Sequence, residues 1–227
     1  MAKLLKKTIK KIIIAVPKGR ILKELTPILK KIKVIPEKDF FNDNSRKIMF
    51  SSNSELINFI KVRSFDVANF VAFGGAHMGI VGLDVIKEFE FEEIYAPVNL
   101  GIGKCRLSVA EPTKMALKDD PKSWSHLKVA TKYPKITKKH FAERGVQAEC
   151  LKLNGALEIA PKLGLSKRIV DLVSTGKTLI ENDLTEVEKI MDITSYLIVN
   201  RNIAKTYPNK INNIITNFRK VLYVKKY

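Results

Sequence analysis

The sequence predicts an α/β protein made of two α/β units around a cleft. Short apolar runs typical of buried strands alternate with helical patterns, and this alternation restarts after Trp124. Two extended segments near residues 185–199 then return the chain toward its first half. We therefore expect domain I to comprise residues 1–104 and 196–227, and domain II to comprise residues 105–195.

Composition excludes several classes of protein. The 227 residues are enough for a buried core, and no apolar run approaches the ~18–20 residues that a membrane span requires. The basic start lacks the apolar segment of a secretion signal, so we expect a cytoplasmic protein without a membrane partner. Cys105 and Cys150 lie far apart without C-x-x-C spacing, which indicates neither a metal site nor a disulfide framework.

The charge balance is strongly basic, with 41 Lys and Arg against 23 Asp and Glu, a net charge of +18. Such an excess suits nucleic acid, an anionic membrane or a polyanionic small molecule. The lysines are scattered along the chain, and no aromatic-rich nucleic-acid motif accompanies them. Nucleic-acid binding is therefore disfavoured, and we expect no nucleic-acid partner.

In the first half, a buried strand at Ile12–Val16 is followed by the basic loop Pro17–Arg20 and an amphipathic helix. Basic loops at the carboxyl ends of strands are where α/β sheets bind ligands. Arg63 follows another strand, and Asp66 is expected to cap the next helix. His77 lies in a Gly-rich turn and is interpreted as a turn residue rather than a catalytic base. The strands expected here are Arg46–Phe50, Leu56–Val62, Met78–Val81, Ile94–Gly101 and Cys105–Ala110.

The second half shows the same rhythm. Gly155–Leu165 has a helical pattern, and the tail from Ile203 to Leu222 has the period of one amphipathic helix. The remaining segments expected are a short helix or loop at Lys114–Asp120, strands at Val129–Thr131 and Ala148–Leu153, a helix at Thr137–Arg144, and extended segments at Thr185–Ile190 and Ser195–Val199.

The central stretch is a strand, Ile169–Val173, that turns into a helix through Ser174, Thr175 and Gly176. The first N–H groups of a helix have no intrahelical partner and favour a bound phosphate. Hydroxyls, including that of Thr178, add donors, while Asp171 can accept hydrogen bonds from a sugar. This pattern indicates a phosphoribosyl group, and an ordinary capped turn is the simpler alternative. A nucleotide P-loop is excluded, because it needs a glycine where Asp171 stands.

A longer motif resembles a known signature. Together with matching segments elsewhere between Ile12 and Val199, it closely resembles that of ATP phosphoribosyltransferase, the first enzyme of histidine biosynthesis. The motif is Glu158-x5-Gly164-x-Ser166-x2-Ile169-x-Asp171-Leu-x2-Thr175-Gly-x-Thr178-Leu179, and the matching segments include Pro17-Lys-Gly-Arg20, Gly79-Ile-Val-Gly82-x-Asp84, Gly101-x-Gly-x-Cys105-Arg-Leu and Glu186-Val-Glu188. The resemblance implies a fold like that of the type II periplasmic binding proteins, two α/β domains around a cleft.

The resemblance also implies a reaction and a site. N1 of ATP would be joined to C1 of phosphoribosyl pyrophosphate with release of pyrophosphate, and Mg²⁺ would be held mainly by substrate phosphates rather than by a protein metal site. Lys18 and Arg63 would be the catalytic cations, and no protein base is needed because N1 is the nucleophile. Domain I would bind ATP through Lys18, Gly19, Arg20 and Arg63. Domain II would bind phosphoribosyl pyrophosphate through Asp171, Ser174, Thr175, Gly176, Lys177 and Thr178.

Four positions differ from the family's usual residues. These differences bear on the adenine-side pocket and its affinity more than on the reaction class. The differing positions are Ala68, Ala72, His77 and Asn154. Long members carry a further regulatory domain after the tail helix, so the resemblance implies the short form. A short-form chain would make a homodimeric core and join a regulatory subunit related to histidyl-tRNA synthetase in a hetero-octamer. A non-catalytic two-lobed ligand-binding protein is the alternative from another class.

Overall fold

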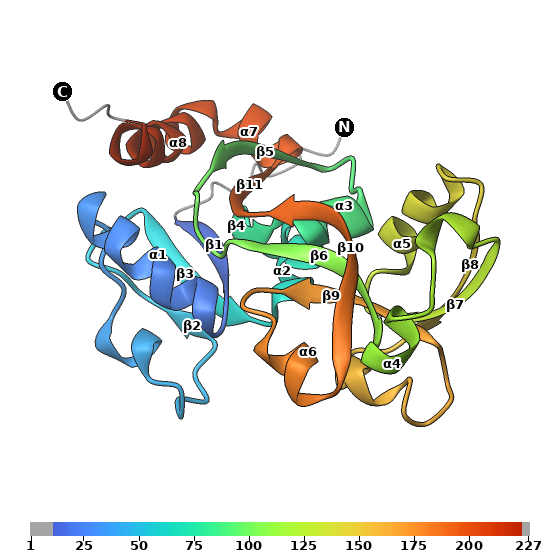
Figure 1. The fold of residues 1–227 in the computed structure, drawn as a ribbon. Helices are drawn as coiled ribbons and strands as arrows, with labels where there is room; N and C mark the ends of the chain where they lie inside the picture. Colours follow the sequence, from blue (N-terminus) through green and yellow to red (C-terminus); the bar gives the residue numbers. More distant parts are fainter. Residues whose placement is uncertain (1–10, 224–227) are drawn as a thin grey trace. The chain divides into compact units, whose positions relative to one another are not determined.

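The computed structural model describes residues 11–223 and divides into two compact units (Figure 1). Unit 1 runs up to Val85 and also includes Phe91–Gly103 and the segment from Ser195 onward. Unit 2 comprises Ile86–Glu90 and Lys104–Thr194. The main divisions therefore fall one residue before the expected ones, and Ile86–Glu90 groups with unit 2 rather than with the first domain.

Unit 1 contains a six-stranded mixed sheet with β1 in its interior. Strand β1 pairs in parallel with β3 and β4, and β11 returns antiparallel between β4 and β5. Parallel pairing leaves the carboxyl ends of β1 and β3 at the same edge of the sheet. The order is β2-β3-β1-β4-β11-β5, with β1 Ile12–Pro17, β2 Met49–Phe50, β3 Ile57–Val62, β4 Met78–Gly82, β5 Ile94–Asn99 and β11 Ser195–Asn200.

Apolar helix faces cover this sheet. Helix α1 (Arg20–Lys31) buries Leu22, Leu25, Ile28 and Leu29 in a core that it shares with β1 and with the last helix. Helix α2 packs so closely on β4 that a Cβ at Gly79 would lie 2.6 Å from Val67. The other helices are η1 (Lys38–Phe41, 3-10), α2 (Ser64–Ala72), α3 (Leu83–Phe89), α7 (Arg201–Thr206) and α8 (Pro208–Leu222).

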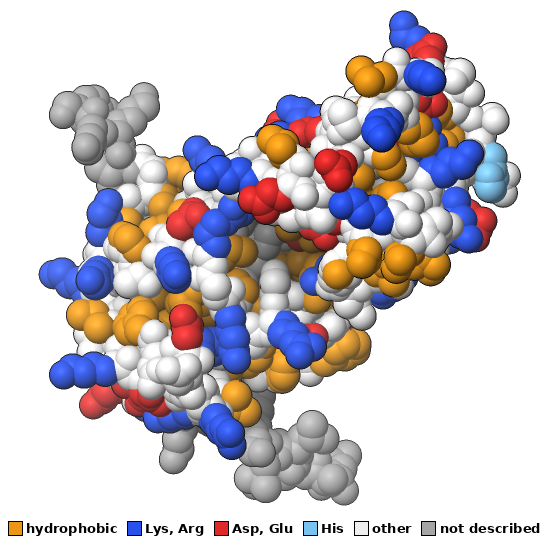
Figure 2. Space-filling view, turned by 60° about the horizontal axis from the view of Figure 1, so that its bottom comes forward, with side chains coloured by type: hydrophobic (Ala, Val, Ile, Leu, Met, Phe, Trp, Pro, Cys, Tyr) orange, Lys and Arg blue, Asp and Glu red, His pale blue; other side chains and the backbone are white. Residues whose placement is uncertain are grey.

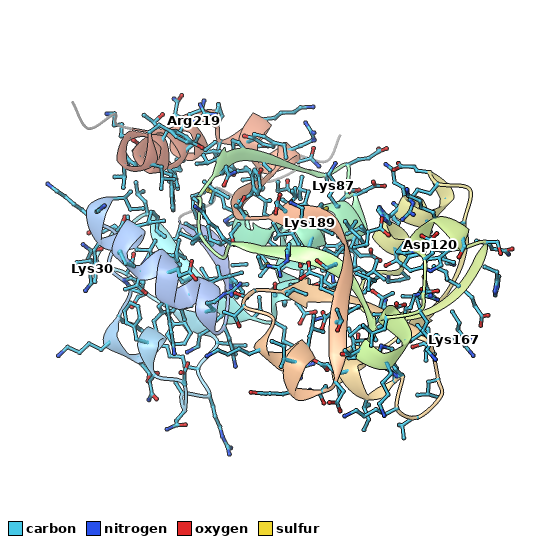
Figure 3. The ribbon with its side chains drawn as sticks, viewed as in Figure 1. Lys30, Lys87, Asp120, Lys167, Lys189 and Arg219 are labelled. Carbon is cyan, nitrogen blue, oxygen red and sulfur yellow. The ribbon has the colours of Figure 1, made fainter. Side chains whose placement is uncertain are left out.

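The tail differs from the single helix expected from Ile203 onward. It forms α7 and α8, with Tyr207 between them, because Pro208 has no N–H to continue the first helix and suits the first turn of a new one. Helix α8 is tied to β5 by Arg219, labelled in Figure 3, which donates to the carbonyl of Pro97 at 3.1 Å.

Unit 2 contains a five-stranded mixed sheet. Strand β7 pairs in parallel with β8 and β9, whereas β6 pairs antiparallel with β9 and β10. The order is β10-β6-β9-β7-β8, with β6 Cys105–Pro112, β7 His126–Thr131, β8 Gln147–Lys152, β9 Arg168–Val173 and β10 Leu184–Ile193. The helices are α4 (Thr113–Ala116), α5 (Pro134–Ala142), α6 (Lys177–Glu181), and the 3-10 turns η2 (Pro121–Ser123) and η3 (Leu157–Ile159).

Three local expectations were wrong. Gly155–Leu165 contains only the turn η3, because Ala156 has a left-handed φ of 50° and Gly164 one of 70°. The strand expected at Arg46–Phe50 shrinks to two residues. Asp66 does not cap α2, which begins at Ser64 with Arg63 at the N-cap and Asp66 in its first turn.

A buried ion cluster fixes the start of β9. The Arg168 side chain is 7% exposed, its Nε lies 2.7 Å from Glu111 Oε2, and its guanidinium also pairs with Asp119. It lies over the Trp124 ring, 4.3 Å from the centroid. Burial raises the pKa of Glu111; at Asp119 burial is outweighed by hydrogen bonds from Arg168 and Trp124, which lower its pKa. One cation thus holds the residues that surround the first position of β9.

Candidate functional site

Residues Ser174, Thr175 and Gly176, here named the phosphate loop, connect β9 to α6. Gly176 has φ +80° at the N-cap of α6, a conformation that residues with a Cβ avoid. Ser174 and Thr175 are exposed, as is Thr178 in the first turn of α6. Among the described residues, no partner is found for the backbone N–H groups of Gly176 and Thr178. The phosphate loop and the first turn of α6 therefore offer two N–H donors without a partner among the described residues, beside three hydroxyl groups.

A cavity of about 140 Å³ lies at this loop. It brings together five of the six residues predicted to bind phosphoribosyl pyrophosphate; the sixth, Lys177, is exposed and does not line it. The lining residues are Glu158, Asp171, Leu172, Val173, Ser174, Thr175, Gly176, Thr178 and Leu179. A larger groove of about 820 Å³ in unit 2 contains none of the predicted residues, so volume alone does not locate the chemistry.

Two carboxylates accompany the loop. The half-buried Asp171 accepts a hydrogen bond from the N–H of Leu172 at 2.8 Å. The pKa of Asp171 is raised to about 6, mainly by burial and also by the charge of Glu158, against the opposing effects of the Leu172 N–H and Lys132. At neutral pH the carboxylate is ionised and can accept hydrogen bonds from sugar hydroxyls. Sequence reasoning gave Glu158 no role, although it is the first fixed position of the motif.

The basic residues predicted in unit 1 follow two paired strands. Pro17 on β1 is in register with Val62 on β3, and the N–H of Lys18 donates to the Val62 carbonyl at 3.2 Å. Lys18 and Arg63 therefore occupy neighbouring positions at one edge of the sheet, both exposed. Gly19, with φ +86° and ψ −140°, takes a backbone conformation restricted to glycine.

Arg20 is already engaged by its own unit. Its guanidinium lies 3.5 Å from the carbonyl oxygen of Gly103, and its Nε lies 3.7 Å from Glu24. Glu24 also accepts the N–H of Gly103 at 2.7 Å. A Cβ at Gly103 would stand 2.7 Å from Ser195 Oγ, so this loop requires glycine. Sequence reasoning missed Glu24, because its partner lies 79 residues away.

His77 is a buried residue in the loop before β4. Its Nδ1 accepts the N–H of Ile13 at 2.8 Å, and its own N–H donates to the Ile13 carbonyl at 2.9 Å. Burial lowers the pKa of His77, so the ring is neutral at pH 7. The nearby Ala72 is also buried, and its carbonyl accepts a hydrogen bond from Asn200. Ala68 is fully buried, whereas Asn154 is exposed.

Positive charge is spread over the surface. Figure 2 shows lysine and arginine side chains distributed over the viewed face among acidic and apolar ones. Lys30 on α1 and Lys167 before β9, labelled in Figure 3, are exposed on separate elements. Within residues 11–223, no helix is long and apolar enough to cross a membrane. Across the same residues, no three His, Cys, Asp or Glu side chains gather in a way that could hold a metal ion.

Comparisons with known proteins identify the family of this chain. Residues 63–220 match the family described as HisG, ATP phosphoribosyltransferase. The chain is 58% identical to the ATP phosphoribosyltransferase of Rhizorhabdus wittichii over 93% of this chain and 96% of the relative. It is also 58% identical to that of Paramagnetospirillum magneticum, over 92% of this chain and 96% of the relative.

A solved structure extends the comparison to the fold. The ATP phosphoribosyl transferase (HisG:HisZ) complex from Thermotoga maritima contains a chain that is 29% identical, with a TM-score of 0.76, covering 93% of this chain and 98% of that chain. The predicted α/β fold with two α/β domains is confirmed. By sequence identity, coverage and fold, the chain belongs to the ATP phosphoribosyltransferase family.

Proposed function

We propose that the phosphate loop and the basic residues of unit 1 carry out the reaction of this family, the first step of histidine biosynthesis. In that reaction N1 of ATP attacks C1 of phosphoribosyl pyrophosphate, the bond from C1 to the pyrophosphate oxygen breaks, and N1-(5-phosphoribosyl)-ATP and pyrophosphate form. The observation that carries the proposal is the cavity at the phosphate loop and the first turn of α6, where hydroxyls and N–H groups that have no partner within residues 11–223 adjoin the carboxylates of Asp171 and Glu158.

Unit 2 is proposed to hold the phosphoribosyl group. The N–H groups of Gly176 and Thr178, with the hydroxyls of Ser174 and Thr175, suit the 5-phosphate, because several convergent donors replace its hydration shell. Asp171 and Glu158 are proposed to accept hydrogen bonds from the ribose hydroxyls, because both carboxylates line the same cavity. Lys177 is proposed to contribute charge at the loop's outer side, since its side chain is exposed.

Unit 1 is proposed to contact ATP and the departing pyrophosphate. Lys18 and Arg63 stand side by side at the sheet edge, so their charges can act together on one polyphosphate. Positive charge there stabilises the negative charge that builds on the leaving oxygen. Gly19 lets the backbone approach the substrate, and Arg20, held by Glu24, shapes the loop. No protein base enters the scheme, because N1 of adenine is the nucleophile.

Mg²⁺ fits this arrangement as a substrate-borne ion. The cavity offers the oxygens of Asp171 and Glu158 but not a third carboxylate, and Mg²⁺ commonly binds through one or two carboxylates plus substrate phosphates. When bound, the ion would neutralise charge on the pyrophosphate. We therefore propose that the phosphates supply most of its ligands.

The assembly is proposed by analogy with the Thermotoga maritima complex, which combines HisG with HisZ. We propose that this chain forms a homodimeric core, that its regulatory partner is a subunit related to histidyl-tRNA synthetase, and that the two form a hetero-octamer in the cytoplasm. Histidine would then act through the partner, so the isolated chain should show little histidine inhibition at concentrations that shut down the complex.

One assay tests the function. Purified chain, ATP, phosphoribosyl pyrophosphate, Mg²⁺ and pyrophosphatase should produce the absorbance of phosphoribosyl-ATP, and omission of either substrate should abolish it. Binding of both substrates without product would instead support a non-catalytic two-lobed binding protein. If a variant with both Asp171 and Gly176 replaced still formed product, the phosphoribosyl site could not lie at this loop.

A further inference from the structure

Arg106 on β6 belongs to a hydrogen-bonded chain that crosses three strands of unit 2. Its Nε donates to Glu186 Oε1 on β10 at 2.6 Å, and a second nitrogen pairs with the other carboxylate oxygen. The buried Ser108 donates to the same Oε1 at 2.8 Å. A bidentate pair of this kind fixes the plane of the guanidinium as well as its position.

The free end of this guanidinium lies at the phosphate loop. Arg106 is in register with Val173, the last residue of β9, and its third nitrogen lies 3.5 Å from the carbonyl oxygen of Ser174, the first residue of the loop. Three of its five N–H donors are used, and the other two have no partner among the described residues. The side chain is 33% exposed, so these donors remain accessible.

Charge and hydrogen bonding reinforce the arrangement. The hydrogen bond from Arg106 lowers the pKa of Glu186, and the same bond raises the pKa of Arg106. The pair therefore stays ionised across the physiological range. Glu186 neutralises one side of the Arg106 guanidinium. The nitrogen of Arg106 on the other side lies at the start of the phosphate loop.

We propose that Arg106 is a positioning residue for phosphoribosyl pyrophosphate, which orders the phosphate loop through the Ser174 carbonyl and is itself aligned by Glu186. The inference rests on the proposed function, in that it takes the loop as the phosphate site. The matching sequence motifs contain Arg106 and Glu186 but assign them no role, and their contact appears only in the folded structure, where β10 runs antiparallel beside β6. Ordering the loop in advance lowers the entropy that binding must otherwise remove.

The same strand supplies a matched control. Glu188, two residues after Glu186 on β10, pairs with Arg144 and His140 on or beside α5 and makes no contact with the loop. Arg144→Met therefore breaks an Arg–Glu pair of β10 without touching the phosphate loop. Arg106→Lys keeps the charge but cannot form the planar two-point contact with Glu186.

The experiment measures equilibrium binding of phosphoribosyl pyrophosphate with Mg²⁺, binding of ATP, steady-state KM and kcat, and the melting temperature of each variant. Arg106→Met should raise the Kd and KM for phosphoribosyl pyrophosphate about tenfold, with ATP binding unchanged. Arg106→Lys should recover part of the loss. Glu186→Gln should weaken binding of phosphoribosyl pyrophosphate by a smaller factor. Arg144→Met should leave the binding of both substrates unchanged.

Several results would overturn the inference. The first such result is that Arg106→Met binds phosphoribosyl pyrophosphate as tightly as Arg144→Met does. The second is that Arg106→Met binds both substrates more weakly, in proportion to the fall in its melting temperature. If Arg106→Met does not fold, normal binding by both Glu186→Gln and Arg106→Lys would contradict the proposal equally. A wild-type chain that binds both substrates without forming product would refute the proposed function alone, because the binding measurement still tests Arg106.

Discussion

The imidazole of His77 accepts the backbone N–H of Ile13 through Nδ1 at 2.8 Å, which joins the loop before β4 to β1. The bond needs a neutral ring with its proton on Nε2, in agreement with the lowered pKa of the buried side chain. The side chain thus serves as a fixed acceptor between neighbouring parts of the sheet. His77 is accordingly a structural residue in this fold.

Replacing His77 therefore tests stability apart from catalysis. His77→Ala leaves the Ile13 N–H without its acceptor and should cost about 1–3 kcal/mol of unfolding free energy, with kcat retained in the folded fraction. His77→Asp keeps an acceptor and should preserve or raise turnover. Denaturant unfolding and initial rates check both variants. A stable His77→Asp protein without activity would show that the ring takes part in the reaction.

Asp171 should make substrate binding pH-dependent. Its pKa of about 6 means that it becomes protonated as the pH falls from 7 to 5, and the affinity for phosphoribosyl pyrophosphate should fall over that range. The substrate's own phosphates titrate nearby, so the same series is run with Asp171→Asn. The difference between the two profiles isolates the carboxylate. Parallel profiles would mean that Asp171 does not contact the ribose. At pH 7.5, Asp171→Ala should weaken binding roughly ten- to a hundredfold.

The same carboxylate should destabilise the free protein at neutral pH. The folded pKa of Asp171 is about 6, against an ordinary value of 3.8, so the folded state binds the proton more tightly between these values. The stability that Asp171 contributes therefore falls as the pH rises through this window. Asp171→Asn should consequently melt at a higher temperature than wild type at pH 7.5, and the difference should shrink toward pH 4. If the difference in melting temperature between Asp171→Asn and wild type were the same at pH 7.5 and pH 4, the raised pKa of Asp171 would be wrong.

Gly176 can be tested against a glycine of the same geometry. Gly176→Val places a β-branched side chain at φ +80°, and its methyl groups would occupy the space that the phosphate needs. Gly145, three residues after the end of α5, has φ +71° and equally open surroundings. The melting temperature should fall by a similar amount in both Val variants. Only Gly176→Val should fail to bind phosphoribosyl pyrophosphate in calorimetric titration. Equal titration curves for the two variants would place the phosphate elsewhere.

Local pattern predicted much of the fold because several strands are continuous apolar runs. The cores of β1, β4 and β9 lie within one residue of the expected limits, since each is buried between flanking strands. The helical pattern at Gly155–Leu165 was misleading, because periodicity carries no information on the left-handed backbone at Ala156. Pro208 indicated a helix break in the tail, but the apolar period continued across it and favoured a single helix.

The candidate site shows the same distinction. Asp171 to Thr178 lie in one continuous strand, loop and helix, so sequence alone could group them around one cavity. The contacts of Glu24 with Gly103 and of Arg106 with Glu186 join residues about 80 positions apart. Tertiary packing brings these residues together, because Glu24 lies on α1 and Gly103 in the loop before β6, while Arg106 and Glu186 lie on the paired strands β6 and β10. No pattern in a single sequence records such long-range contacts.

Lys18 and Arg63 should act on the transition state more than on substrate binding. They follow the paired residues Pro17 and Val62, and charge on the pyrophosphate grows only as the C1–O bond breaks. Arg63→Gln should therefore lower kcat by about 10²-fold or more with a smaller change in KM, and Lys18→Gln should act in the same direction. Because neighbouring charges serve one group, the double variant should lose less activation free energy than the sum of the losses in the two single variants.

Lys23→Gln, at an exposed position of α1, controls for the general loss of charge. Rates with both substrates saturating decide the matter. An effect confined to KM would mean that these cations hold the ground state alone.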